Sequence, residues 1–124
     1  MSAKDAGTLV GLLFLSRDLA HRAHLKAKGV GSDAAHRALG AFYDAVVDQA
    51  DNFAELYQGC YLTLLDIPLM TANTEDMVKL LSDNITWIKA NRNKVCDGDT
   101  CLANTLDDIL ALHYRTRYKL TYLK

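Results

Sequence analysis

Proline is almost absent from this chain, with Pro68 the only one among 124 residues. Because proline ends or kinks helices and is common in turns, its scarcity favours long helices over a turn-rich β-sandwich. Half of the residues are apolar and 23% are charged, which excludes wholesale disorder. The length predicts a single domain over residues 1–124, large enough to bury its own core.

Apolar side chains recur at helical spacing in four stretches separated by short polar or glycine-containing segments. Ser32, Thr74 and Thr100 are of the residue types that cap helix N-termini, and we expect them to begin the second, third and fourth helices. The predicted helices cover about 6–28, 33–59, 75–94 and 101–123.

The connections between these helices constrain the topology. The first and third are short, so each joins antiparallel neighbours. The middle connection, Cys60–Asn73, can span about 40 Å when extended, and the second helix is also about 40 Å long. It is therefore long enough to run the full length of the bundle. The predicted fold is all-α, a ferritin-like four-helix bundle with one long crossover between helices two and three.

The formal net charge is −1, from 14 basic and 15 acidic side chains. The first seven residues carry one lysine and one aspartate, unlike a basic tail, so DNA binding is not expected. The apolar run Leu9–Leu15 is too short for a membrane span and lacks the flanks of a signal peptide. A cytoplasmic location without membrane association is expected. Cys96 and Cys101 could bridge in an oxidising compartment, but we expect both to be reduced.

Four side chains in the first half of the chain could bind a metal. His24 and His36 lie six residues before and after Val30, so an antiparallel hairpin brings the two imidazoles together. Asp51 and Glu55 are four residues apart and share one face of the second helix. Two imidazoles and two carboxylates suit iron, manganese or zinc.

Within one chain, the two histidines and the two carboxylates are too far apart to bind the same metal ion. His36 and Asp51 are fifteen residues apart, which is about 22 Å along a helix. Two antiparallel hairpins related by a two-fold axis near residue 44 would bring the histidines of one chain to the carboxylates of the other. The spacing therefore predicts two identical metal sites per dimer, each shared across the interface.

This pattern resembles the Dps mini-ferritins, which are ferritin-like shells that oxidise and store iron. The matching stretch runs without gaps from about Arg22 to Gln58, with its two histidines twelve residues apart and Asp-x-x-x-Glu following. The resemblance implies that His24 and His36 bind iron together with Asp51 and Glu55 of a dimer mate, Glu55 bridging two irons. It also implies ferroxidase activity with peroxide or dioxygen, and a closed homo-oligomer of twelve subunits.

The chain departs from the family pattern at three positions of the matching stretch. Gly40 stands where the family usually has an aspartate, Leu25 where it has tryptophan, and Leu56 where it has arginine. The missing carboxylate is expected to weaken the site, and the substitution Gly40→Asp is expected to raise its metal affinity. Asp44 is too far along the helix to replace it, whereas His21 could add a donor.

Other interpretations remain open. Short chains of this type also resemble phage-encoded Dps-like proteins, so a non-catalytic structural or virion-associated role with a degraded metal site is the alternative. Asp51 could belong to a solvated acidic helix face. We expect His113 to be a hydrogen-bonded packing residue, and the tyrosines at four-residue spacing in the fourth helix to pack as well; they are Tyr114, Tyr118 and Tyr122.

Overall fold

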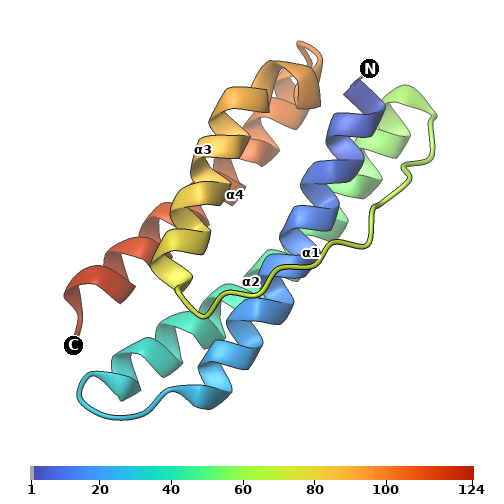
Figure 1. Ribbon diagram of the computed structural model, residues 1–124. Helices are drawn as coiled ribbons and strands as arrows, with labels where there is room; N and C mark the ends of the chain where they lie inside the picture. The colour runs from blue at the N-terminus through green and yellow to red at the C-terminus, as the bar shows by residue number, and fades with distance from the viewer. Residues whose placement is uncertain (1) are drawn as a thin grey trace.

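The computed structural model describes residues 2–124, and this part of the chain folds into four helices without a β-strand (Figure 1). The predicted all-α four-helix class is therefore confirmed. The helices are α1 (Ser2–Lys26), α2 (Ser32–Tyr61), α3 (Met77–Cys96) and α4 (Thr100–Tyr122).

The connection between α2 and α3 runs back along the bundle beside α1 (Figure 1). As a result, α3 points in the same direction as α2 and antiparallel to α1. Helix α1 packs against α2 and α3, and α4 packs against the same two helices. Because α4 runs in the same direction as α1, all four neighbouring pairs are antiparallel. The predicted long crossover is thus present, and it occupies residues 62–76.

Close contact between this crossover and α1 depends on two glycines. Gly7 and Gly11 are buried and lie one turn apart on α1. A Cβ atom on Gly7 would collide with the carbonyl oxygen of Asp66, and one on Gly11 would lie 2.8 Å from the carbonyl oxygen of Pro68. Both contacts involve backbone atoms, so only glycine lets the crossover lie this close to the helix.

The helix starts differ from the sequence prediction because aspartates act as the N-caps. Asp76 accepts a hydrogen bond from the backbone N–H of Lys79 at 3.0 Å. Asp99 accepts one from Leu102 at 2.9 Å. The expected caps Thr74 and Thr100 were therefore wrong: Thr74 precedes the cap, and Thr100 is the first residue of α4.

The first two helices also depart from their predicted limits. Helix α1 begins by Ser2 and ends at Lys26, before the glycine turn, whereas α2 continues to Tyr61. Ser32 is the first residue of α2, and its predicted capping role was wrong because Gly31 holds the cap position with φ 79° and no side-chain bond.

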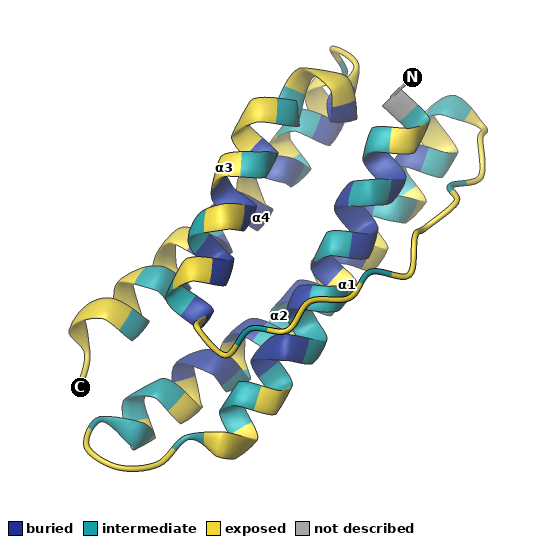
Figure 2. Cartoon of the chain, viewed as in Figure 1, coloured by how far each residue is buried: buried dark blue, intermediate teal, exposed yellow. Residues whose placement is uncertain are grey.

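The core is built from the inward faces of all four helices (Figure 2). Its largest fully buried side chains are Phe42, Phe53, Leu9, Leu13, Leu81, Ile88, Leu102, Leu106 and Ile109. These residues fall on the predicted apolar stripes, so burial of each stripe explains why the four segments pack as a bundle.

One polar network crosses this core. His113 is fully buried; its Nδ1–H donates to the carbonyl of Ile109 at 2.9 Å, and its Nε2 accepts from the amide of Asn84 at 3.2 Å. The same amide donates to the hydroxyl of Ser16 at 2.7 Å. Three helices are thereby joined, and the prediction that His113 is a hydrogen-bonded packing residue is confirmed. Burial lowers the pKa of His113, because the charged ring would lose its hydration.

This shift makes stability depend on pH. The unfolded chain protonates His113 near its ordinary pKa of about 6.5, whereas the folded protein resists protonation until a lower pH. Stability contributed by the neutral ring is therefore complete above about pH 6.5 and is lost as the pH falls below it. Urea unfolding gives the free energy of unfolding at pH 7.5 and at pH 5.5. From the higher to the lower pH, this free energy should fall more in wild type than in His113→Gln, by up to about 1.4 kcal/mol. Equal losses in the two proteins would contradict this assignment.

Candidate metal centre

The turn between α1 and α2 brings His24 and His36 together. Gly29 and Gly31 take left-handed conformations, with φ 88° and 79°, which close the hairpin tightly. The two imidazoles stack with ring centroids 3.6 Å apart and an interplanar angle of 18°. The predicted convergence of the two histidines is confirmed.

The two histidines also exchange hydrogen bonds. Nδ1 of His24 donates to the carbonyl of His36 at 2.6 Å, and Nδ1 of His36 donates to the carbonyl of His24 at 2.8 Å. The carbonyl of His24 lies in the last turn of α1, where carbonyls lack an intrahelical partner. Because a carbonyl can only accept, each ring carries its proton on Nδ1, and Nε2 keeps a lone pair in the neutral form. Histidines that bind metals typically donate their other N–H in this way.

Three further side chains extend the histidine pair. His21 stacks on Tyr43 with ring centroids 4.2 Å apart, and His24 meets Tyr43 edge-on at 5.3 Å. The guanidinium carbon of Arg17 lies 5.5 Å from the centre of the Tyr43 ring. Tyr43 was not singled out in the sequence, although its position seven residues after His36 places both on one face of α2. His21 joins this cluster next to the pair rather than within the stack.

Gly40 has a packing role at this site. A Cβ atom there would lie 3.1 Å from Cε1 and 3.2 Å from Nδ1 of His24. The absent side chain lets the imidazole lie directly against α2 and reach the carbonyl of His36. Compared with the Dps pattern that the sequence resembles, Gly40 lacks a carboxylate and, at the same time, makes room for the histidine pair.

Asp51 and Glu55 lie elsewhere on α2, and both are exposed. Among residues 2–124, no three histidine, cysteine, aspartate or glutamate side chains lie close enough together to hold a metal ion. The core of the described chain holds no buried carboxylate either; its buried polar residues are Ser16, Asn84, His113 and Thr116. One chain thus presents two separated pairs of donors, and their combination between two chains stays a prediction.

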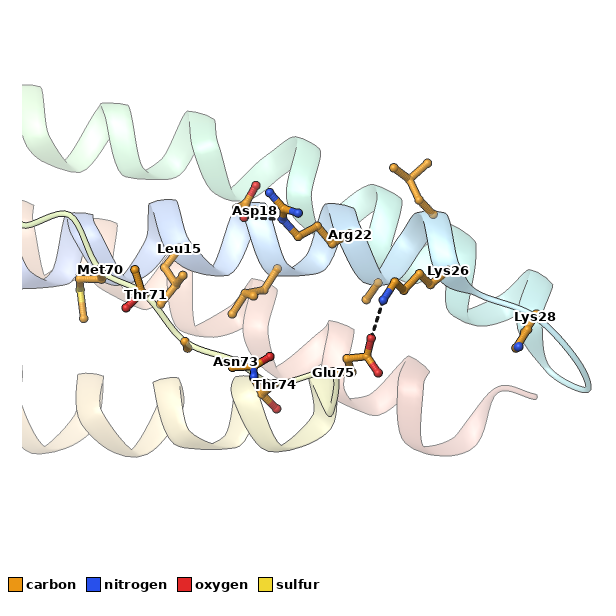
Figure 3. A pocket seen from close by; sticks show the side chains of 14 residues that line it. Leu15, Asp18, Arg22, Lys26, Lys28, Met70, Thr71, Asn73, Thr74 and Glu75 are labelled. Atoms are coloured by element: carbon orange, nitrogen blue, oxygen red, sulfur yellow. Dashed lines mark hydrogen bonds and ion pairs between the residues drawn. The ribbon is translucent and has the colours of Figure 1, made fainter.

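A large hollow lies between α1 and the crossover, with a volume of about 1170 Å³ (Figure 3). Its wall includes the ion pairs Asp18–Arg22, at 2.8 Å, and Lys26–Glu75, at 2.7 Å. The Lys26 ammonium lowers the pKa of Glu75 by hydrogen bonding to its carboxylate. Since these charges neutralise one another, the groove offers less for an ionic ligand than the histidine pair does.

The tyrosines of α4 do not pack as expected. Tyr114, Tyr118 and Tyr122 are 38%, 55% and 73% exposed. Their four-residue spacing places them on one stripe, but that stripe faces away from the core. They are therefore not core residues, and their packing is confined to the surface, where the rings of Tyr118 and Tyr122 lie 5.7 Å apart.

Substitutions at Gly40 test whether His24 is a ligand. Gly40→Ala adds a methyl group that displaces the imidazole, so anaerobic titration should show Fe²⁺ affinity lowered on the order of tenfold. Gly40→Asp adds the same Cβ together with a carboxylate donor and should bind Fe²⁺ more tightly than Gly40→Ala and wild type. Unchanged affinity in Gly40→Ala would mean that His24 does not bind the metal.

No helix within residues 2–124 is long and apolar enough to cross a membrane. In comparisons with known proteins, no curated protein and no solved structure matches this chain significantly. One family model does match, over residues 24–120, and its description is a family of unknown function, DUF5856. The match includes both histidines and both carboxylates of the candidate centre. Because it covers most of the sequence, the chain belongs to the DUF5856 family.

Proposed function

We propose that this protein binds ferrous iron and oxidises it at sites shared between two chains, as a Dps-like mini-ferritin. The observation that carries the proposal is the reciprocally hydrogen-bonded pair His24–His36, in which both rings keep Nε2 available. Iron is the substrate, and manganese and zinc are alternative occupants of the same donor set.

The second half of each site comes from the partner chain. Asp51 and Glu55 are exposed on α2, so they are accessible to another copy of the hairpin. Asp44 and Asp48 are exposed on the same helix, and their charges add to a negative field that attracts Fe²⁺. Pairing two α2 helices antiparallel about residue 44 supports two equivalent sites, each with two imidazoles and two carboxylates.

The chemistry proposed at each site is electron transfer from two ferrous ions to one oxidant. Two Fe²⁺ give two electrons to hydrogen peroxide, and two protons complete its reduction to two molecules of water. Glu55 bridges the irons and lowers the repulsion between them, while the histidines complete the ligand set. Ferric product is stored inside a closed shell, so a cytoplasmic protein of this kind removes both iron and peroxide.

A second candidate function is structural. Gly40 leaves each site without the further carboxylate of typical mini-ferritins, which lowers the expected metal affinity. A site with low metal affinity is consistent with a structural protein of a shell or virion that has lost catalysis. Ferrous oxidation by the purified protein separates the two candidates.

Removal of either kind of ligand should abolish most ferrous oxidation. Glu55→Ala removes the proposed bridge, and His24→Ala removes a donor from a site that holds few. Both variants should stay folded and assembled, since an exposed Glu55 contributes little to packing. Stopped-flow oxidation of Fe²⁺ by peroxide should be slowed at least tenfold in each.

Asp108→Asn is the matched control, because it removes an exposed carboxylate from α4. This variant should oxidise iron at the wild-type rate. Identical traces for wild type and Glu55→Ala would exclude the proposed site and favour the structural function.

Assembly is a separate test. A site that needs two chains requires an oligomer, and the resemblance implies twelve subunits in a closed shell. Light scattering at micromolar concentration should show a mass well above the 13.7 kDa of one chain. A stable monomer would contradict the shared-site proposal.

A further inference from the structure

The three cysteines occupy different environments at the end of the bundle that holds the α3–α4 turn. Cys96 is the last residue of α3 and is only 3% exposed. Cys60 lies in the last turn of α2 and Cys101 in the first turn of α4, and both are exposed as free thiols. The thiol pair accessible to solvent is therefore Cys60 and Cys101, although Cys96 is closer to Cys101 in sequence.

Two hydrogen bonds hold the end of α2 against the α3–α4 turn, one to the last residue of α3 and one to the N-cap of α4. The hydroxyl of Tyr61 donates to the carbonyl of Cys96 at 3.1 Å. The thiol of Cys60 donates to Oδ2 of Asp99 at 3.6 Å, while Oδ1 of Asp99 caps α4. Asp99 thus fixes the Cys60 thiol beside the turn of helix that carries Cys101.

The two thiols share one small hollow. Its volume is about 290 Å³, and Cys60, Cys101, Asp99 and Glu55 line it together with apolar neighbours. Partial desolvation, the Asp99 carboxylate and the neighbouring Cys101 all raise the pKa of the Cys60 thiol.

We propose that Cys60 and Cys101 form a redox-active dithiol that closes to an intramolecular disulfide when peroxide oxidises it. One thiolate attacks a peroxide oxygen and becomes a sulfenic acid, releasing hydroxide that takes up a proton. The second thiolate attacks the sulfenic sulfur, forms the S–S bond and expels a second hydroxide. In total, two thiols and one hydrogen peroxide give one disulfide and two molecules of water.

The geometry also indicates the order in which the two thiols react and the effect of the disulfide on stability. The hydrogen bond to Asp99 favours the protonated form of the Cys60 thiol, so Cys60 is expected to react second, with the sulfenic acid. The bond would join α2 to α4 and enclose the crossover and α3 in a covalent loop. A cross-link over a loop of this length restricts the unfolded chain and stabilises the fold. This inference does not depend on iron chemistry.

The test uses metal-free protein in chelator with one equivalent of hydrogen peroxide, followed by thiol counting in denaturant. Wild type should fall from three free thiols to one and lose about 2 Da without forming cross-linked dimers. Its thermal midpoint should rise on the order of 10 °C and return after reduction. Cleavage before Asp97 and Asp99 separates Cys96 from Cys101, so the linked peptides identify the pair.

Variants in which one cysteine is replaced show which two cysteines form the disulfide. Cys96→Ser should still lose both of its thiols to peroxide and about 2 Da of mass. Cys101→Ser should keep both of its thiols. Cys60→Ser keeps the thiol that reacts first but lacks its partner, so it should form a sulfenic acid at Cys101, with one thiol lost and about 16 Da gained, and no disulfide. Loss of two thiols in Cys60→Ser would show that Cys96 pairs with Cys101 instead. That result, a disulfide between chains, or no loss of thiols in wild type would each overturn the proposal.

Discussion

The close approach of the crossover to α1 is the constraint on which the rest of the structure depends. Gly7 and Gly11 remove two side chains from one face of α1, and backbone atoms of Asp66 and Pro68 take their place. With the crossover held along the helix, α3 must begin at the far end of the bundle (Figure 1). That placement makes every neighbouring pair of helices antiparallel and leaves α1 between α2 and α3.

The same arrangement determines what the first hairpin can do. Helix α2 packs against α1 and α4, so its outer face, with His36, Asp51 and Glu55, stays exposed. The histidine pair does not need a metal to be ordered, because backbone carbonyls orient both rings. Gly40 permits this by leaving space for the His24 ring. The metal centre that we propose between two chains would require donor groups that are accessible and preorganised in this way.

Much of the fold could be predicted from the sequence because its signals are local. Helical periodicity identified the four helices, and the length of one connection identified the crossover. The caps were harder to predict, since Thr74 and Asp76, or Asp99 and Thr100, are all suitable residue types. Tertiary contacts decide between them: Asp99 both caps α4 and accepts the thiol of Cys60.

The candidate site could be predicted only in part, for the same reason. The register of a short hairpin follows from sequence, so the pairing of His24 with His36 was predictable. The contacts of Tyr43 and Gly40 depend on how closely α1 and α2 approach. The close contact of Gly11 with the crossover was likewise hidden, because Pro68 lies far along the chain. The spacing of the α4 tyrosines placed them on one stripe but did not indicate which way it faces.

Complementation between chains tests the shared site most directly. One chain would carry His24→Ala with His36→Ala, and the other Asp51→Ala with Glu55→Ala, so that neither oligomer alone has an intact site. In each mixed dimer, the histidines of the second chain meet the carboxylates of the first and rebuild one site of two. Co-expression with random pairing should therefore restore about a quarter of the wild-type ferrous oxidation rate. Mixed oligomers that form but remain as inactive as their parents would contradict a site shared between chains.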